Sequence, residues 1–218
     1  HAVGHHLIHC NAFTHFIYLE GDIRLTFVNF CYWIDARETL RRSGLLPAYV
    51  RVEHRKATLT FTSSDSFSQI HIPFQANIEA SGQLFFNMSN PYNPLYILDA
   101  DLAQEYMASD SFGMDTSLSV CSWGKAERAA MGLCLERVPE GFASRYVVPV
   151  TSDNRIPAYA WVSHLPNNYA NSPDSPLGKI PVATLATGAP DRGMANPWST
   201  AETLLSQAQD VDVDRLYY

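Results

Sequence analysis

The side chains best suited to metal chemistry lie in the first ten positions of the chain. His5 and His9 are four residues apart, as are His6 and Cys10, so each pair would share one helix face at a zinc-compatible spacing. A closed zinc site needs about four ligands. The others would have to come from distant positions: His15, His54 or His71. Because no second Cys/His pair with finger-like spacing follows, we expect no metal site and no cofactor.

Cys121 and Cys134 would be the candidate nucleophiles of a chymotrypsin-like viral cysteine protease, which has about this length and an all-β fold. Such a nucleophile sits in a glycine-rich turn whose backbone amides form the oxyanion hole. Here the two cysteines lie in SVCSWG and GLCLER, inside alternating patterns that are typical of strands. The chain also lacks Gly-x-Ser-x-Gly, a glycine-rich phosphate loop and HExxH. We therefore predict that the chain is not an enzyme and has no catalytic residues.

The charge balance argues against nucleic-acid binding. The chain has 22 acidic and 15 basic residues and a net charge of -7, whereas a nucleic-acid-binding domain shows a basic stripe. The densest basic groups are Arg41-Arg42 and RVEHRK at 51–56, and we expect both to be ordinary solvated charge. No apolar run reaches the roughly 18 residues of a membrane span, and the first residues do not form a signal-peptide pattern.

The cysteines and one glycosylation sequon indicate whether the protein resides in a reducing or a secretory compartment. No CxxC pair occurs, so we expect free thiols in a reducing compartment. Asn87-Met-Ser89 matches the N-glycosylation sequon. Because no secretory signal accompanies it, we regard this match as chance.

Alternation of apolar and polar side chains predicts several strands in the first half of the chain. Residues 21–28 place Ile23, Leu25 and Phe27 on one side, which is typical of a strand with one buried face. Residues 5–18 suit a short helix or a strand, and residues 35–44 an exposed turn or helical segment ended by Gly44. Alternation recurs in 49–64, with Ala57, Leu59 and Phe61 on one side, and in 67–74, so we expect strands there. Another short strand is expected at 81–88.

The second half of the chain is less regular. Residues 90–113 contain Asn-Pro twice and predict a long loop with a helical turn at 101–107. Residues 115–123 and 128–138 predict two strands of a hairpin. From Pro139 onward the chain holds most of its 13 prolines and shows little periodicity.

These elements together predict an all-β fold, an antiparallel sandwich or barrel. We divide the chain into a β-domain at 1–138 and an extended C-terminal arm at 139–218. The arm is too rich in proline to form its own core and too rich in Trp and Tyr to be a free linker. We expect it to lie over its own domain or over a neighbour.

Three segments, in family order, resemble jelly-roll capsid proteins of picornavirus-like (Picornavirales) positive-strand RNA viruses. FTHFIYLEGDIRLTFV resembles the aromatic-rich segment that turns through a glycine into a core strand. SQIHIPFQAN is similar to a strand that ends in Ile-Pro-Phe, and LSVCSWGKAERAAMGLCLERVPEGF to the last hairpin. The residues that fill these patterns are Phe16, Tyr18, Gly21, Asp22, Ile23 and Phe27; Ile72, Pro73 and Phe74; and Met131, Gly132, Leu133, Leu135 and Pro139.

This resemblance implies an eight-stranded antiparallel jelly-roll sandwich, whose first strand is not evident here, with an extended C-terminal arm. It implies a structural subunit cut from a polyprotein, which assembles with other capsid subunits in the host cytoplasm into an icosahedral virion enclosing the RNA genome. RNA contacts would fall to a basic segment not shown here or to another subunit. No membrane span is expected.

Two other functions remain open. A soluble jelly-roll carbohydrate-binding module could use Trp33, Trp123 or Trp161 as stacking platforms. The chymotrypsin-like cysteine protease would use Cys121 or Cys134 as its nucleophile.

Overall fold

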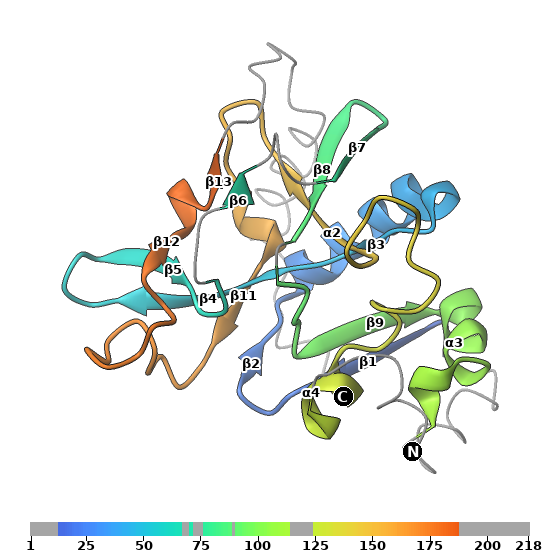
Figure 1. Ribbon diagram of the computed structural model, residues 1–218, viewed down its shortest axis with the longest axis horizontal. Helices are drawn as coiled ribbons and strands as arrows, with labels where there is room; N and C mark the ends of the chain where they lie inside the picture. Colours follow the sequence, from blue (N-terminus) through green and yellow to red (C-terminus); the bar gives the residue numbers. More distant parts are fainter. Residues whose placement is uncertain (1–12, 67–69, 72–75, 89, 114–123, 188–218) are drawn as a thin grey trace, which may run out of the picture.

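The computed structural model describes residues 13–66, 70–71, 76–88, 90–113 and 124–187. Within these ranges the chain is rich in short β-strands, has few helices and forms no closed barrel (Figure 1). The strands are β1 (His15–Leu19), β2 (Ile23–Arg24), β3 (Leu46–Pro47), β4 (Val50–Arg55), β5 (Thr60–Ser63), β6 (Ile70–His71), β7 (Asn77–Ala80), β8 (Gln83–Asn87), β9 (Leu95–Asp99), β10 (Tyr146–Val150), β11 (Trp161–His164), β12 (Ile180–Pro181) and β13 (Ala186–Thr187). The α-helices are α2 (Phe27–Leu40), α3 (Ala100–Met107) and α4 (Lys125–Ala130). The 3-10 helices are η1 (Arg41–Ser43), η3 (Asp110–Phe112), η5 (Ala158–Ala160) and η6 (Val182–Thr184).

The described strands form sheets of mixed direction. A five-stranded sheet has the order β12-β5-β4-β11-β2, a four-stranded sheet the order β3-β10-β8-β7, and β1-β9 and β13-β6 are two-stranded. β10 pairs in parallel with β3, β11 with β4, and β13 with β6. The prediction of a β-rich fold is therefore confirmed. The prediction of wholly antiparallel pairing is wrong for these three pairs, because strands from the last third of the chain insert beside early strands.

Helix α2 replaces most of the strand that was expected at residues 21–28, of which only Ile23–Arg24 is a strand. Thr26 stops the strand because it caps the helix: its backbone is extended and its hydroxyl accepts from the Asn29 backbone N–H at 3.3 Å. The Asn29 side chain accepts from the Thr26 backbone N–H at 2.9 Å in return, which completes a capping box. Gly44, at φ 74°, follows η1 in the left-handed conformation, so the predicted helix end is confirmed.

The hairpin of β4 and β5 exposes the residues that were expected to face the core. Leu59 lies in the turn at φ 52° and is 78% exposed, and Phe61 is 46% exposed, whereas Thr62 is fully buried. The prediction for 57–62 is thus wrong about which side faces inward. The strand predicted at 81–88 is confirmed as β8. Within the strand predicted at 67–74, the structure describes Ile70 and His71, which form β6.

Strand β9 lies inside the segment that was predicted to be a loop at 90–113. Its sequence LYILD is a short apolar run, buried at Leu95, Ile97 and Leu98, and therefore shows no alternation that would mark it. The helical turn expected at 101–107 is confirmed as α3. The strand expected at 128–138 is wrong, because α4 and a series of turns occupy it, while 115–123 lies outside the described residues.

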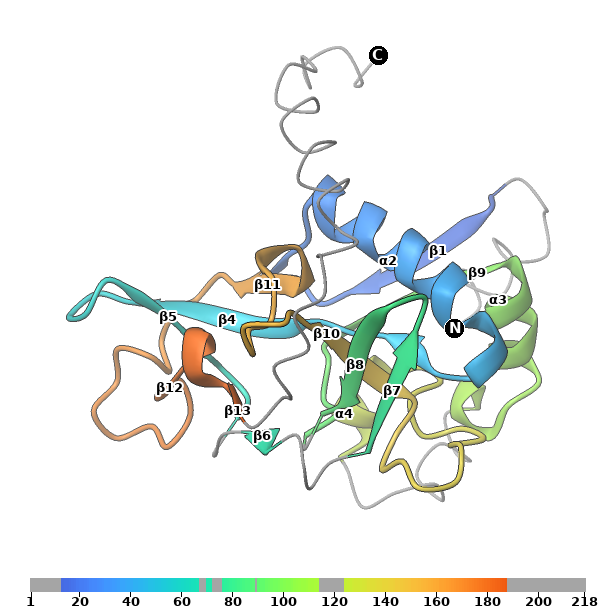
Figure 2. The ribbon, with the colours of Figure 1, turned by 90° about the horizontal axis from the view of Figure 1, so that it is seen from above.

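The last third of the chain enters both larger sheets. β10 lies between β3 and β8 and is buried along its whole length, and β11 lies between β4 and β2. Figure 2 shows β10 beside β8 and β11 beside β4. Their apolar residues belong to the same hydrophobic core as α2 and β9. The prediction of an arm that lies on the outside from residue 139 is therefore wrong for residues 146–164. The physical reason is that the apolar segment Tyr-Val-Val-Pro-Val lowers its free energy more by burial in the core than by contact with water. Residues 188–218 lie outside the described residues.

Candidate functional site

Most of the side chains considered for chemistry are buried or lie outside the described residues. The first ten positions, Cys121 and Trp123 lie outside them. His15 packs its ring against Phe30 and Trp33, with centroid distances of 5.4 and 5.9 Å. In the described part of the chain, no group of three or more His, Cys, Asp or Glu residues could hold a metal ion.

Of the proposed stacking platforms and nucleophiles that the structure describes, Trp33 and Cys134 are not accessible. Trp33 is 2% exposed and Cys134 is fully buried. Trp161 is half-buried, and its indole N–H donates to the Ile156 carbonyl at 3.0 Å. The sequon residue Asn87 is 1% exposed, and its amide donates to the Tyr146 carbonyl at 2.7 Å, so the folded chain cannot present it for glycosylation.

The candidate site that sequence reasoning missed lies in the five-stranded sheet. It joins Asp22, directly before β2, Glu53 of β4 and His164 of β11, whose strands are neighbours in the order β4-β11-β2. His164 Nδ1 lies 2.5 Å from Glu53 Oε1, and Nε2 lies 3.2 Å from Asp22 Oδ2. The His164 side chain is 3% exposed, that of Glu53 is fully buried, and that of Asp22 is 42% exposed.

Further contacts hold the imidazole in place. Its ring stacks on Tyr169 at a centroid distance of 5.2 Å and an interplanar angle of 19°. The second oxygen of Glu53 accepts from the Ala170 backbone N–H at 2.5 Å. Because both imidazole nitrogens face carboxylate oxygens, the doubly protonated ring can donate to both sides, and the neutral ring to one only. Oδ1 of Asp22 is buried without a hydrogen-bond partner among the described residues.

An ion pair lies next to this cluster on β4. Arg51 donates to Asp65 through Nε at 2.9 Å and through Nη2 at 2.5 Å, a bidentate pair in which both residues are buried. The guanidinium also lies over the Tyr92 ring at 5.6 Å from the centroid. The Tyr92 hydroxyl donates to Glu20 at 3.4 Å.

The expectation that RVEHRK is solvated charge is wrong for Arg51 and Glu53. Both lie on a central strand whose residues Val50 to Glu53 are all buried. The alternation of Val with Arg and Glu was the available signal, because it places both charged side chains on one face of β4. Buried charges are paired, so the partners come from elsewhere in the chain. Arg41 is partly exposed and pairs with Glu38 and Asp101.

An open cleft of about 490 Å³ lies where β1, α2 and α3 meet. Carboxylates outnumber the two guanidinium groups of its lining, and both guanidiniums are paired: Arg37 donates to Asp99 at 2.9 Å, and Arg41 to Asp101 at 2.8 Å. Asp99 also caps α3 by accepting from the Leu102 backbone N–H at 2.8 Å. These pairs join α2 to α3, and no cation is left over to bind an anionic ligand among the described residues that line the cleft.

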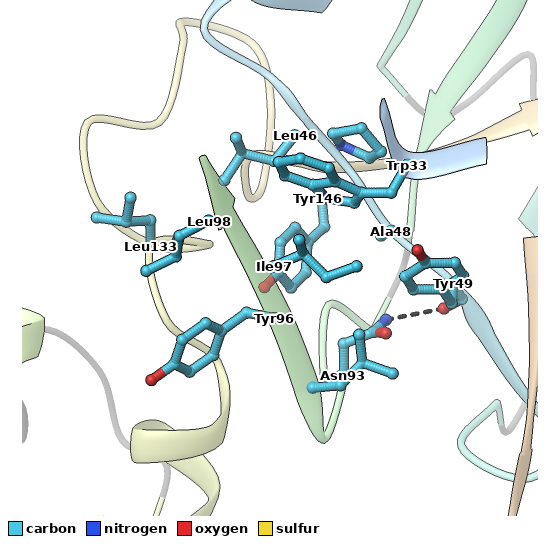
Figure 3. A pocket seen from close by; sticks show the side chains of 12 residues that line it. Trp33, Leu46, Ala48, Tyr49, Asn93, Tyr96, Ile97, Leu98, Leu133 and Tyr146 are labelled. Atoms are coloured by element: carbon cyan, nitrogen blue, oxygen red, sulfur yellow. Dashed lines mark hydrogen bonds between the residues drawn. The ribbon is translucent and has the colours of Figure 1, made fainter. Parts of the chain in front are cut away.

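A small internal cavity lies between β3, β9 and α2, with Trp33, Tyr49, Asn93, Ile97 and Tyr146 around it (Figure 3). Its volume of about 10 Å³ is that of one water molecule, which excludes an organic ligand. The Asn93 amide donates to the Tyr49 carbonyl at 2.8 Å, and its oxygen is buried with no partner among the described residues.

No protein-family model, curated protein or solved structure matches this chain. Among the described helices, none is both long and apolar enough to cross a membrane. The buried site links strands that are far apart in the sequence, and its imidazole is closed to a substrate.

Proposed function

We propose that this chain is a structural subunit of a small icosahedral virus shell of the picornavirus-like kind, which acts through its surfaces and not as an enzyme. Other capsid subunits would be its partners, and assembly would take place in the host cytoplasm. The sequence resemblance is the basis of this role, but two of its three segments depart from the implied strands: α2 replaces most of the strand at 21–28, and α4 with turns replaces the second strand of the hairpin. The jelly roll that the resemblance implies is supported by the antiparallel pairs of β4 with β5 and β7 with β8, whereas the three parallel pairs depart from it.

The main structural observation behind this proposal is a pair of exposed apolar patches. The β1 patch consists of Phe13, Ile17, Tyr18 and Leu19, which are 53, 47, 36 and 40% exposed. The hairpin patch consists of Leu59 and Phe61, which are 78 and 46% exposed. In both views the β4–β5 hairpin projects at one end of the body, and β1 lies away from it, beside β9 (Figures 1 and 2).

Two separate patches favour an assembly larger than a dimer. A protein with one such patch can bury it in a dimer and then stop growing, whereas two separated patches let each subunit contact different neighbours. Contiguous exposed apolar groups mark interaction surfaces, and subunits of large assemblies bury about 2,000 Å² or more in their interfaces. A shell subunit needs contacts of this kind on several sides.

Light scattering after size exclusion, with negative-stain microscopy of the same fractions, tests the proposal on the purified full chain. We expect species larger than a dimer that grow with concentration. The double variant Leu59→Asn and Phe61→Thr should stop growth at a smaller species, because it removes the hairpin patch, and Asn tolerates the left-handed backbone at 59. Thr58→Ser, at an exposed position of the same turn, serves as the control.

A chain that stays monomeric or dimeric at every concentration would contradict the shell role. A monomer that also binds immobilised polysaccharide would favour the carbohydrate-binding module instead.

A further inference from the structure

Strand β1 has one paired edge and one free edge within the described part of the chain. It pairs with β9 alone, in the register Leu19 to Leu95 and Ile17 to Ile97. The Glu20 backbone N–H donates to the Pro94 carbonyl at 3.1 Å, which continues this register. In an antiparallel ladder, residues alternate between those that direct both N–H and C=O to the partner and those that direct them away.

The hydrogen bond of Glu20 shows which backbone N–H and C=O groups of β1 point towards β9 and which point away from it. Because Glu20 faces β9, Tyr18 and Phe16 do so as well, and the backbone groups of His15, Ile17 and Leu19 point to the other edge. None of these three residues has a recorded backbone partner on that side in the described chain. The edge therefore offers three N–H and three C=O groups for pairing.

The side chains of β1 do not protect this edge. Natural edge strands are commonly blocked by lysine, proline or a bulge, whereas β1 reads His-Phe-Ile-Tyr-Leu and contains none of these. Ile17, Tyr18 and Leu19 are consecutive and all exposed, so neither face is fully covered there. Tyr18 is held in place because it stacks on its cross-strand neighbour Tyr96, with centroids 5.0 Å apart.

We propose that β1 pairs antiparallel with β1 of a second copy of this chain, with the two-fold axis at Ile17. In this register Ile17 faces Ile17 of the partner subunit, His15 faces Leu19 of the partner subunit, and Phe16 faces Tyr18 of the partner subunit. The pairing forms about six hydrogen bonds and joins the two β1-β9 pairs into one continuous sheet.

Charge and side-chain pairing favour a second copy as the occupant. A two-fold pairing is self-complementary, so the same strand satisfies both edges at once. Each cross-strand pair is apolar or aromatic, the kinds of pair that stabilise sheets. The nearest carboxylate, on Glu20, would face Thr14 of the partner subunit and not another carboxylate. This interface does not depend on the proposed shell function, because a dimer of this kind can form in any assembly.

Sedimentation equilibrium of the full chain tests the interface, with circular dichroism as a check on folding. Ile17→Lys places two ammonium groups opposite each other on the axis, and we expect the dimer dissociation constant to rise by at least about tenfold. Leu165→Lys is the matched control, because Leu165 is 57% exposed and lies outside β1. An unchanged dimer in a folded Ile17→Lys variant overturns the proposal, and so does a monomeric wild type.

Oxidative crosslinking of Ile17→Cys tests the register. Residues opposite each other in a hydrogen-bonded pair have Cα atoms about 5.5 Å apart, within the range that a disulfide spans. Peptide mass spectrometry should find two copies joined at position 17, and Leu165→Cys should not crosslink. Equal crosslinking of both variants, or its absence in both, overturns the register.

The two proposals can fail separately. A dimer that crosslinks at position 17 but forms nothing larger contradicts the shell function alone. Large assemblies without that crosslink contradict the β1 interface alone.

Discussion

The Nδ1 atom of His164 lies 2.5 Å from Oε1 of Glu53 in the interior of the five-stranded sheet. The two residues are 111 positions apart in the sequence, and their contact joins β11 to β4. Glu53→Gln keeps the shape of the side chain but removes the buried charge that accepts from His164 and from Ala170. We expect a loss of about 2 kcal/mol in the free energy of unfolding.

Urea denaturation at neutral pH measures this loss. Glu38→Gln is the control, since its side chain is 76% exposed and, among the described residues, pairs with Arg41 alone, and it should change the free energy by less than about 0.5 kcal/mol. Equal effects of the two variants would show that the buried pair has no special role in stability.

Gly132 lies against the ring of Tyr96. It has φ 52°, and a Cβ atom added there would lie 2.8 Å from two ring carbons. Gly132→Ala therefore combines a strained backbone with displacement of a ring that packs against Tyr18 and Tyr106. We expect a loss of about 3 kcal/mol. Thermal unfolding measures it, and Gly141→Ala, at φ 85° with open space around it, should lose only the backbone part of about 1 kcal/mol.

Asn29 ties the start of α2 to the last third of the chain. Its side chain completes the helix cap with Thr26 and donates to the carbonyls of Tyr159 at 2.8 Å and Trp161 at 2.7 Å. Asn29→Ala leaves both carbonyls without this donor, so we expect a loss of about 3 kcal/mol. Thr39→Ala is the control for chemical denaturation, at a half-buried residue of the same helix whose hydroxyl donates only within the helix, to the Asp35 carbonyl at 3.0 Å. A loss below about 1 kcal/mol would contradict a role beyond the cap.

The carboxyl of Glu20 gives a pH-dependent prediction. Burial raises its pKa above the ordinary value, and nearby Asp22 adds to this. Because the folded chain then holds this proton more tightly than the unfolded chain, the contribution of Glu20 to stability falls as pH rises through the raised pKa. Glu20→Gln should therefore stabilise the protein at pH 7 by a few tenths of a kcal/mol, since solvent screens the charge, and should change little near pH 4. Melting temperatures at both pH values check this, and a gain confined to acid pH would contradict it.

Local patterns were sufficient where structure depends on neighbouring residues. The short strand expected at 81–88 is β8, and Gly44 predicted the end of a helical segment, because strand preference and left-handed backbone preference are largely local properties. The same kind of signal failed at 21–28. The apolar and polar residues there alternate, but the Thr26 and Asn29 cap favours a helix that also gains contacts with η5 and β11.

The sequence by itself determined that this chain is β-rich and acidic, and that it contains no long apolar run. Only the tertiary structure decided that Arg51 and Glu53 are buried, that His164 lies between two carboxylates, and that β10 and β11 belong to the central sheets. The reason is physical: periodicity reports which side chains share a face, whereas the partner of a strand or of a buried charge comes from distant residues. The free energy of burying Arg51 or Glu53 depends on those partners, so it cannot be read from the neighbouring sequence.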